Sequence, residues 1–199
     1  MSNAARLTAP MTVSEFQGWT PEPGREGWRW HLIDGTPFGM APASNAHAAI
    51  QSRTSSIIDN HLARLRRCVV LTAPGVVPKA GSKTNQLVPD LGVSCTDQPD
   101  GNTMRDPVLL VEILSPSNAA ITRGNIYAYK TIPSVQEILA LESRSVSGML
   151  HRRDDQGQWL DDPEELGADS IVHLRSIDLS VALVAFYGSS GLALRQMTP

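Results

Sequence analysis

Two acidic side chains in otherwise apolar surroundings are the residues of this sequence best suited to chemistry. The first, Glu112, lies in the run Val-Leu-Leu-Val-Glu-Ile-Leu at positions 108–114, where all the remaining residues are aliphatic. Alternate residues of a strand share a face, so Glu112 is expected between Leu110 and Leu114. An unpaired carboxylate there costs several kcal/mol. Glu112 should therefore be neutral, salt-bridged or bound to a cation, unless fraying near Ser115 lets it reach water.

The second acid is Asp90, which follows Pro89 and precedes Leu91 in a strand-like stretch. Taken alone, Pro-Asp is also a common turn signal. Two carboxylates that converge from adjacent strands would offer the hard oxygen ligands that Mg²⁺ requires, with waters completing the octahedron. Such an ion can activate water and offset the charge that builds on a scissile phosphate. If the two acids meet, they indicate metal-dependent hydrolysis of a phosphate ester.

The pattern around these acids indicates α/β architecture. Thr12 and Glu15 form a capping box that opens a short helix, and Asp34-Gly35 is a hairpin signal between strands at 28–33 and 37–40. Helical periodicity predicts helices at 46–67 and 118–130, and a final short one near 179–187. Strand-like runs occur at 68–72, 76–79, 86–95, 108–114, 135–141, 146–152 and 171–174. The acidic segment 154–167 is expected to be a surface loop, and the helix at 118–130 implies a parallel or mixed strand pairing across it.

Length and composition favour one folded domain spanning 1–199. Hydrophobic residues make up 41% and charged residues 19% of the 199 positions, as in ordinary globular proteins. No apolar run approaches the roughly 20 residues of a membrane span, and the first ten residues lack the features of a secretory signal, so a cytoplasmic protein without a membrane partner is expected. The net charge of −3 argues against binding nucleic acid through bulk charge but allows a local basic groove.

Cysteine and lysine are both scarce in this sequence, which limits the residues that could bind a metal through sulfur or serve as a catalytic lysine. Cys68 and Cys95 show no metal-knuckle or disulfide spacing, so two buried free thiols are expected. Of the 17 basic residues only three, Lys79, Lys83 and Lys130, are lysines. Any catalytic lysine must be one of these.

Several motifs together resemble the Uma-two family, whose members are described as endonucleases of the PD-(D/E)xK superfamily. In order, they are Met-Thr-Val-Ser-Glu-Phe at 11–16, Leu-Ile-Asp-Gly at 32–35, His47, Val-Pro-Asp at 88–90, Val-Glu-Ile-Leu-Ser-Pro-Ser at 111–117 and Tyr-Lys-Thr-Ile-Pro-Ser-Val-Gln-Glu-Ile at 129–138. The resemblance covers roughly residues 11–150. It implies a restriction-endonuclease-like core, with a central mixed β-sheet flanked by helices, and Mg²⁺- or Mn²⁺-dependent cleavage of DNA. It also implies that Asp90, Glu112 and the backbone carbonyl of Ile113 hold the metal.

The chain departs from the family pattern where a lysine is expected. The superfamily's lysine would be at Leu114, and the helix position to which this family displaces it is Asn125. Asn125 can donate a hydrogen bond but carries no charge. Lys83, which precedes Asp90, could reach the site, although a surface position is the simpler expectation.

Two histidines complete the set of candidates for the remaining polar contacts. His31 stands where the family tends to have a glutamate, and His47 matches a family histidine. Each could act as a ligand or proton carrier, or be structural.

Two functions remain open at this point. The leading hypothesis is a magnesium-dependent DNA endonuclease, in which a homodimer would let two sites address two strands. The alternative is a catalytically degenerate nuclease fold that serves as a binding or interaction module. The missing lysine and the acidic pI of about 5.9 favour the alternative.

Overall fold

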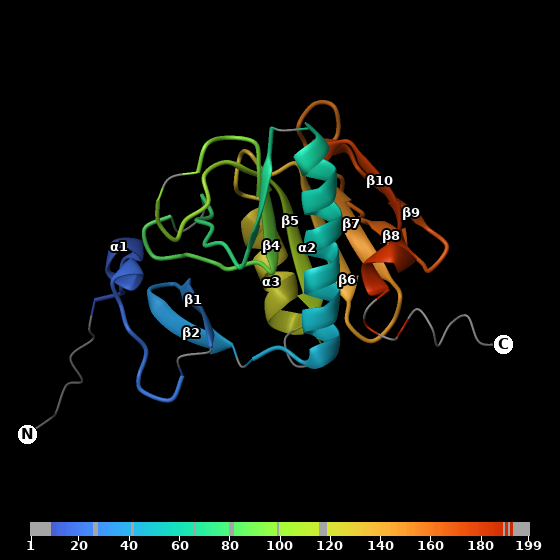
Figure 1. Cartoon of the computed structure of the whole chain (residues 1–199). Helices are drawn as coiled ribbons and strands as arrows, with labels where there is room; N and C mark the ends of the chain where they lie inside the picture. The colour runs from blue at the N-terminus through green and yellow to red at the C-terminus, as the bar shows by residue number, and fades with distance from the viewer. Residues whose placement is uncertain are drawn as a thin grey trace, which may run out of the picture.

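A six-stranded mixed sheet forms the centre of the protein, in the order β3-β4-β5-β6-β7-β8 (Figure 1). The computed structural model describes residues 9–25, 28–40, 42–65, 67–79, 82–98, 100–115, 119–188, 190 and 192. The strands of the sheet are β3 (Val69–Thr72), β4 (Leu91–Ser94), β5 (Pro107–Leu114), β6 (Glu137–Glu142), β7 (Gly148–Arg152) and β8 (Glu164–Leu166). The fold is therefore the α/β class expected from the sequence.

Helices and two separate hairpins surround this sheet. The hairpins are β1 (Arg29–Ile33) with β2 (Thr36–Met40), and β9 (Ile171–Leu174) with β10 (Leu179–Ala182). The helices are α1 (Val13–Gln17), α2 (Asn45–Leu65) and α3 (Ala119–Tyr129), with short 3-10 segments η1 (Arg175–Ile177) and η2 (Leu183–Tyr187). None of the helices in the described ranges combines the length and apolar character needed to cross a membrane.

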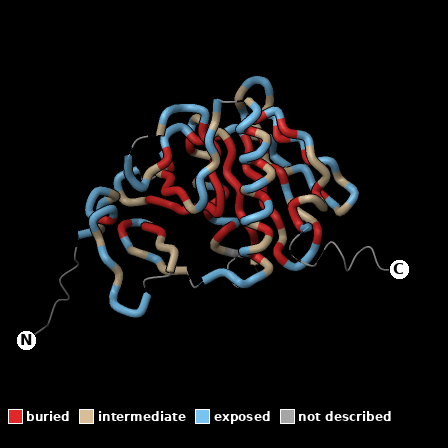
Figure 2. Tube along the Cα trace, in the orientation of Figure 1, coloured by how far each residue is buried: buried red, intermediate tan, exposed pale blue. Residues whose placement is uncertain are grey.

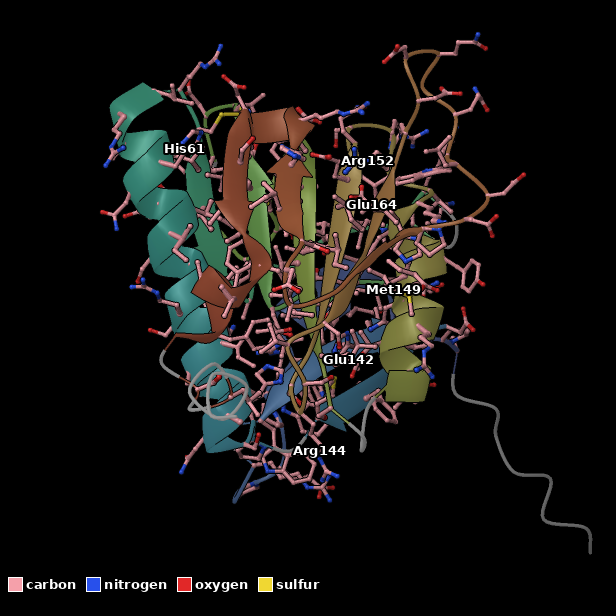
Figure 3. All side chains as sticks on the ribbon, turned by 90° about the vertical axis from the view of Figure 1, so that its right-hand side faces the viewer. His61, Glu142, Arg144, Met149, Arg152 and Glu164 are labelled. Atoms are coloured by element: carbon pink, nitrogen blue, oxygen red, sulfur yellow. A yellow bond between two sulfur atoms is a disulfide. The ribbon has the colours of Figure 1, made fainter. Side chains whose placement is uncertain are left out.

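The sheet divides the interior into two apolar clusters, and β5 contributes to both. Leu109, Val111 and Ile113 pack with α2 and the β9–β10 hairpin, whereas Leu110 and Leu114 pack with α3. Figure 3 shows the resulting layers, with α2 and α3 on opposite sides of the strands. Figure 2 shows the buried residues concentrated along the central strands. The face of β5 that carries Glu112 is thus the face covered by α3.

Strand pairing follows the predicted crossover. β5 and β6, which α3 connects, are parallel, and the other neighbouring pairs of the sheet are antiparallel. The Asp34-Gly35 turn also forms as expected, because Ile33 pairs with Thr36 and both turn residues have positive φ. At α1 the Thr12 hydroxyl accepts from the Glu15 amide and the Glu15 carboxylate accepts from the Thr12 amide, which completes the capping box.

Four predicted elements differ from the structure. Residues 76–79 and most of 86–95 are not continuous strands, because only isolated bridges, such as Val76 with Leu87, join them and Pro78 and Pro89 have no amide hydrogen to donate to a ladder. The segment 154–167 contains β8, whose Glu164 and Glu165 are exposed and made it look like a loop. The expected helix at 179–187 begins as β10, where Leu179 is buried and Ser180 exposed.

The expectation of two free thiols was wrong, because Cys68 and Cys95 form a disulfide. The register of β3 and β4 explains the pairing: Val69 lies opposite Ser94, so the two cysteines at the next positions face each other. The sequence separation of 27 residues hides this neighbourhood. The bond closes the loop that contains Asp90.

Breaking this bond should destabilise the fold. A crosslink over 27 residues restricts the unfolded chain and is worth about 3–4 kcal/mol in the chain-entropy description. We expect Cys68→Ala/Cys95→Ala to lower the free energy of unfolding by that amount in urea titrations. Reductant should produce a similar loss in the natural chain and none in the double variant. Equal stability of the oxidised natural chain and the double variant would contradict the assignment.

Candidate active site

Asp90 and Glu112 meet at the start of β4. The antiparallel register pairs Leu91 with Val111, and this places Asp90, one residue before the strand, opposite Glu112. Both side chains are buried, with 1% and 5% exposure respectively. The charge of Asp90 acts on the pKa of Glu112, so the two carboxyl groups are close enough to influence each other. The convergence that the sequence only suggested is therefore present.

Asp90 is held by donors from three different elements. Its Oδ1 accepts from Nη1 of Arg29 on β1 at 2.5 Å and lies 2.9 Å from Nε2 of His47 on α2, while its Oδ2 accepts from the Ile113 amide at 2.7 Å. Burial opposes ionisation, but the His47 hydrogen bond and the Arg29 charge outweigh it, so the pKa of Asp90 is lowered. Asp90 is therefore the ionised member of the pair.

Glu112 is the protonated member. Burial, followed by the charge of Asp90, raises the pKa of Glu112 well above its ordinary value, against the opposing effect of Tyr129. The Tyr129 hydroxyl donates to Glu112 Oε1 at 2.6 Å, and burial raises the pKa of this phenol well above its usual value, so it remains a donor. The two carboxyl groups thus share one proton and one negative charge.

This pair has the chemistry to hold a divalent cation, which would replace the shared proton. A carboxylate can accept about four hydrogen bonds or metal contacts. Three donors already contact the Asp90 carboxylate, so one position remains for a cation. Among the described residues no group of three or more His, Cys, Asp or Glu side chains is arranged around a metal position. A two-carboxylate site still fits Mg²⁺, which commonly takes one or two carboxylates and fills its remaining positions with water and substrate phosphate.

Comparison with known proteins identifies the family of this chain. The sequence model of the Uma2 family, described as "Putative restriction endonuclease", matches residues 13–183. The chain belongs to the Uma2 family. An uncharacterized protein of Synechocystis is 30% identical over 182 residues, which cover 89% of this chain and 91% of that protein. A crystal structure from Anabaena variabilis, described as a putative nuclease belonging to DUF820, superposes with a TM-score of 0.69 at 18% identity, over 91% of this chain and 99% of that one. The two chains share the same fold.

The two candidate histidines lie in different settings. His47 contacts Asp90 directly. His31 is buried beside the pair, but its Nδ1 accepts from the Val88 amide at 3.2 Å and its Nε2 lies 2.9 Å from the sulfur of Met40. Burial and the Arg29 charge lower the pKa of His31 to about 4. The structure therefore presents His31 as a neutral ring with both nitrogens engaged.

The remaining candidates are divided between the site and the surface. Asn125 is buried on α3, one turn before Tyr129, and so lies on the side of α3 that faces Glu112. Lys83 lies in an exposed turn where its carbonyl accepts from the Val13 amide, and no described contact joins its side chain to either carboxylate. Ile113 contributes its amide to Asp90, while the role expected for its carbonyl remains a prediction.

Arg29 and Tyr129 are the site residues that the sequence reasoning missed. Arg29 is two positions before His31 and therefore shares its face of β1, which is a signal that could have been used. Tyr129 is four positions after Asn125 on α3, the spacing that places two side chains on one helix face. Neither spacing could be used without knowing that β1 and α3 pack near Glu112.

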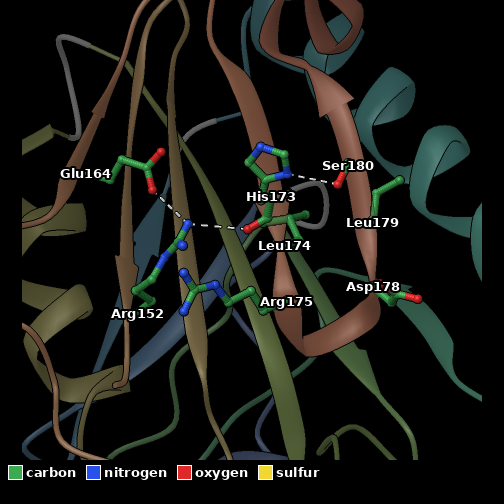
Figure 4. Close-up of a pocket in the computed structure, with 8 residues that line it drawn as sticks. All are labelled: Arg152, Glu164, His173, Leu174, Arg175, Asp178, Leu179 and Ser180. Carbon is green, nitrogen blue, oxygen red and sulfur yellow. Dashed lines mark hydrogen bonds and ion pairs between the residues drawn. The ribbon is translucent and has the colours of Figure 1, made fainter. Parts of the chain in front are cut away.

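A second charged cluster lies apart from this site, in a pocket beside β9 (Figure 4). Arg152 pairs with Glu164 at 2.7 Å and donates to the His173 carbonyl at 3.3 Å. Glu137 accepts from the amides of Arg175 and Ser176 at 3.2 and 2.8 Å. Because these charges already have partners that tie the β9–β10 hairpin to the sheet, the cluster is structural.

The raised pKa of Glu112 predicts a stability test. A group with a raised folded-state pKa loses its contribution to stability as the pH rises above its ordinary value of 4.5. Glu112→Gln keeps an acceptor for Tyr129 and a donor for Asp90 but has no proton to lose. In chelator-treated protein we expect this variant to gain melting temperature over the natural chain at pH 8 but not at pH 4. Each kcal/mol gained corresponds to roughly 2–4 °C in a chain of this size.

Asp59→Asn is the matched control, because Asp59 is an exposed acid on α2. It removes the same charge and should show no such pH dependence. A Glu112→Gln variant whose effect on stability is equal at both pH values would show that folding does not raise the pKa of Glu112.

Proposed function

We propose that this protein is a nuclease that hydrolyses phosphodiester bonds in DNA with Mg²⁺ or Mn²⁺. One observation carries the proposal: Asp90, one residue before β4, and Glu112 on β5 converge at a buried point beside the sheet. Membership of the Uma2 family, described as "Putative restriction endonuclease", and the fold shared with the Anabaena variabilis structure described as a putative nuclease support it.

The metal would be held by Asp90, Glu112 and the carbonyl of Ile113. When bound, it would supply a Lewis acid that lowers the pKa of water and offsets phosphate charge. The protein's own part is to keep the ligands in place. The Ile113 amide fixes Oδ2 of Asp90, and Tyr129 fixes Oε1 of Glu112. Rigid ligands reduce the reorganisation needed during the reaction.

The partners of Asp90 also set its charge. His47 and Arg29 keep this carboxylate ionised in a buried position. Once Glu112 loses its proton, the pair carries two negative charges against the one positive charge of Arg29, and this excess favours a cation. Because Glu112 must release its proton to become a ligand, metal binding should be coupled to proton release.

The net charge of −3 means that attraction of DNA must be local. Arg29, at the carboxylate pair, provides such a local positive charge. Cutting both strands of a duplex would require two sites, and we propose that a homodimer supplies them.

A degenerate nuclease fold that only binds a partner is the second candidate. The observation in its favour is that Arg29 already neutralises Asp90, so the described site is charge-compensated without a metal. Under this alternative the protein would bind no divalent cation at Glu112.

Removing the carboxylates tests the proposal. We expect the purified protein to nick supercoiled plasmid with Mg²⁺ or Mn²⁺, and Asp90→Ala and Glu112→Gln to lower the rate by roughly 10³-fold, equivalent to about 4 kcal/mol. Asp59→Asn should cleave at the natural rate. Manganese titration calorimetry should show one site in the natural chain and none in Asp90→Ala.

The two functions give different results in this experiment. A natural chain that binds no manganese and leaves the plasmid intact would favour the binding module. Cleavage that is unchanged in Asp90→Ala would exclude the proposed active site.

A further inference from the structure

The carboxylate pair has no lysine beside it. Leu114, at the position of the superfamily's lysine, lies in the apolar cluster under α3, and Asn125 is uncharged. Lys79 and Lys83 are exposed, and Lys130 lies over the rings of Tyr127 and Trp159, at 6.0 and 5.5 Å from their centroids. A nuclease that lacks this lysine needs another source of positive charge at the phosphate.

Arg29 brings a positive charge to the pair from outside the central sheet. It comes from β1, and its Nη1 donates to Oδ1 of Asp90 at 2.5 Å. Its charge also influences the pKa values of Glu112, Tyr129 and His31, so its electrostatic effect extends beyond Asp90.

Arg29 is more exposed to solvent than Asp90 and its other side-chain partner, His47. The Arg29 side chain is 23% exposed, whereas those of His47 and Asp90 are 6% and 1% exposed. Arg29 therefore reaches from solvent to the buried carboxylate. The bond to Asp90 uses one of the five N–H donors of a guanidinium, whose fork geometry matches a phosphate.

We infer that Arg29 is a catalytic residue that supplies the positive charge for which related nucleases use a lysine. The inference rests on the nuclease function proposed above. As a bond forms between a water oxygen and phosphorus, the bond from phosphorus to the leaving sugar oxygen breaks. The water loses one proton and the leaving oxygen gains one. Arg29 donates to a non-bridging phosphate oxygen throughout, and its anchorage on Asp90 holds it in position.

Removal and restoration of the charge test this role. We expect Arg29→Ala to lower the single-turnover cleavage rate by at least about 10²-fold while manganese still binds in titration calorimetry, because no metal ligand is lost. Guanidinium ion at non-denaturing millimolar concentration should restore part of the rate to Arg29→Ala and none to Asp90→Ala. Arg29→Met/Leu114→Lys, which returns a lysine to the superfamily's position, should also recover activity over Arg29→Met.

Arg53→Ala is the control, because Arg53 is an exposed arginine of α2 that donates to the Ala185 carbonyl. It should cleave at the natural rate and not respond to guanidinium. If the natural chain does not cleave, the proposed function itself fails. If the natural chain cleaves and Arg29→Ala retains more than about a third of its rate, loses manganese binding, or is restored by neither guanidinium nor Leu114→Lys, the role of Arg29 is overturned.

Discussion

The burial of two carboxyl groups opposite each other is the constraint on which this structure depends. Two ionised acids, one just before β4 and one on β5, would repel each other in a medium that solvates neither. The protein resolves the conflict by leaving one proton on Glu112 and surrounding Asp90 with donors. The site is therefore a balanced charge system, in which removal of one partner affects the others.

This balance requires elements that are distant in the chain. Arg29 arrives on the β1–β2 hairpin, His47 in the first turns of α2, and Tyr129 in the last turn of α3. The Ile113 amide comes from β5 itself. Each element contributes one group, so the packing of the hairpin and both helices against the sheet also assembles the site. Stability and site geometry are consequently linked through the same contacts.

The two members of the pair have opposite effects on stability. Asp90, with three donors, gains from folding when ionised, whereas Glu112 is held in a place that disfavours its charge. Structural ion pairs elsewhere, such as Arg152 with Glu164, have no comparable conflict. An unfavourable carboxylate that the fold retains is typical of functional sites, where strain in the resting state is relieved by a ligand.

The sequence by itself determined the elements and the anomaly. Helical periodicity located α2 and α3, and the Asp-Gly pair located the first hairpin. The apolar run around Glu112 located β5 and marked a carboxylate that needed a partner. Only the tertiary structure decided what that partner is. Register placed Asp90 opposite Glu112 and Cys68 opposite Cys95, and packing brought Arg29 and Tyr129 to the pair. Local pattern encodes the face on which a side chain lies, but the neighbour across that face depends on strand register and layer packing, which long-range contacts determine.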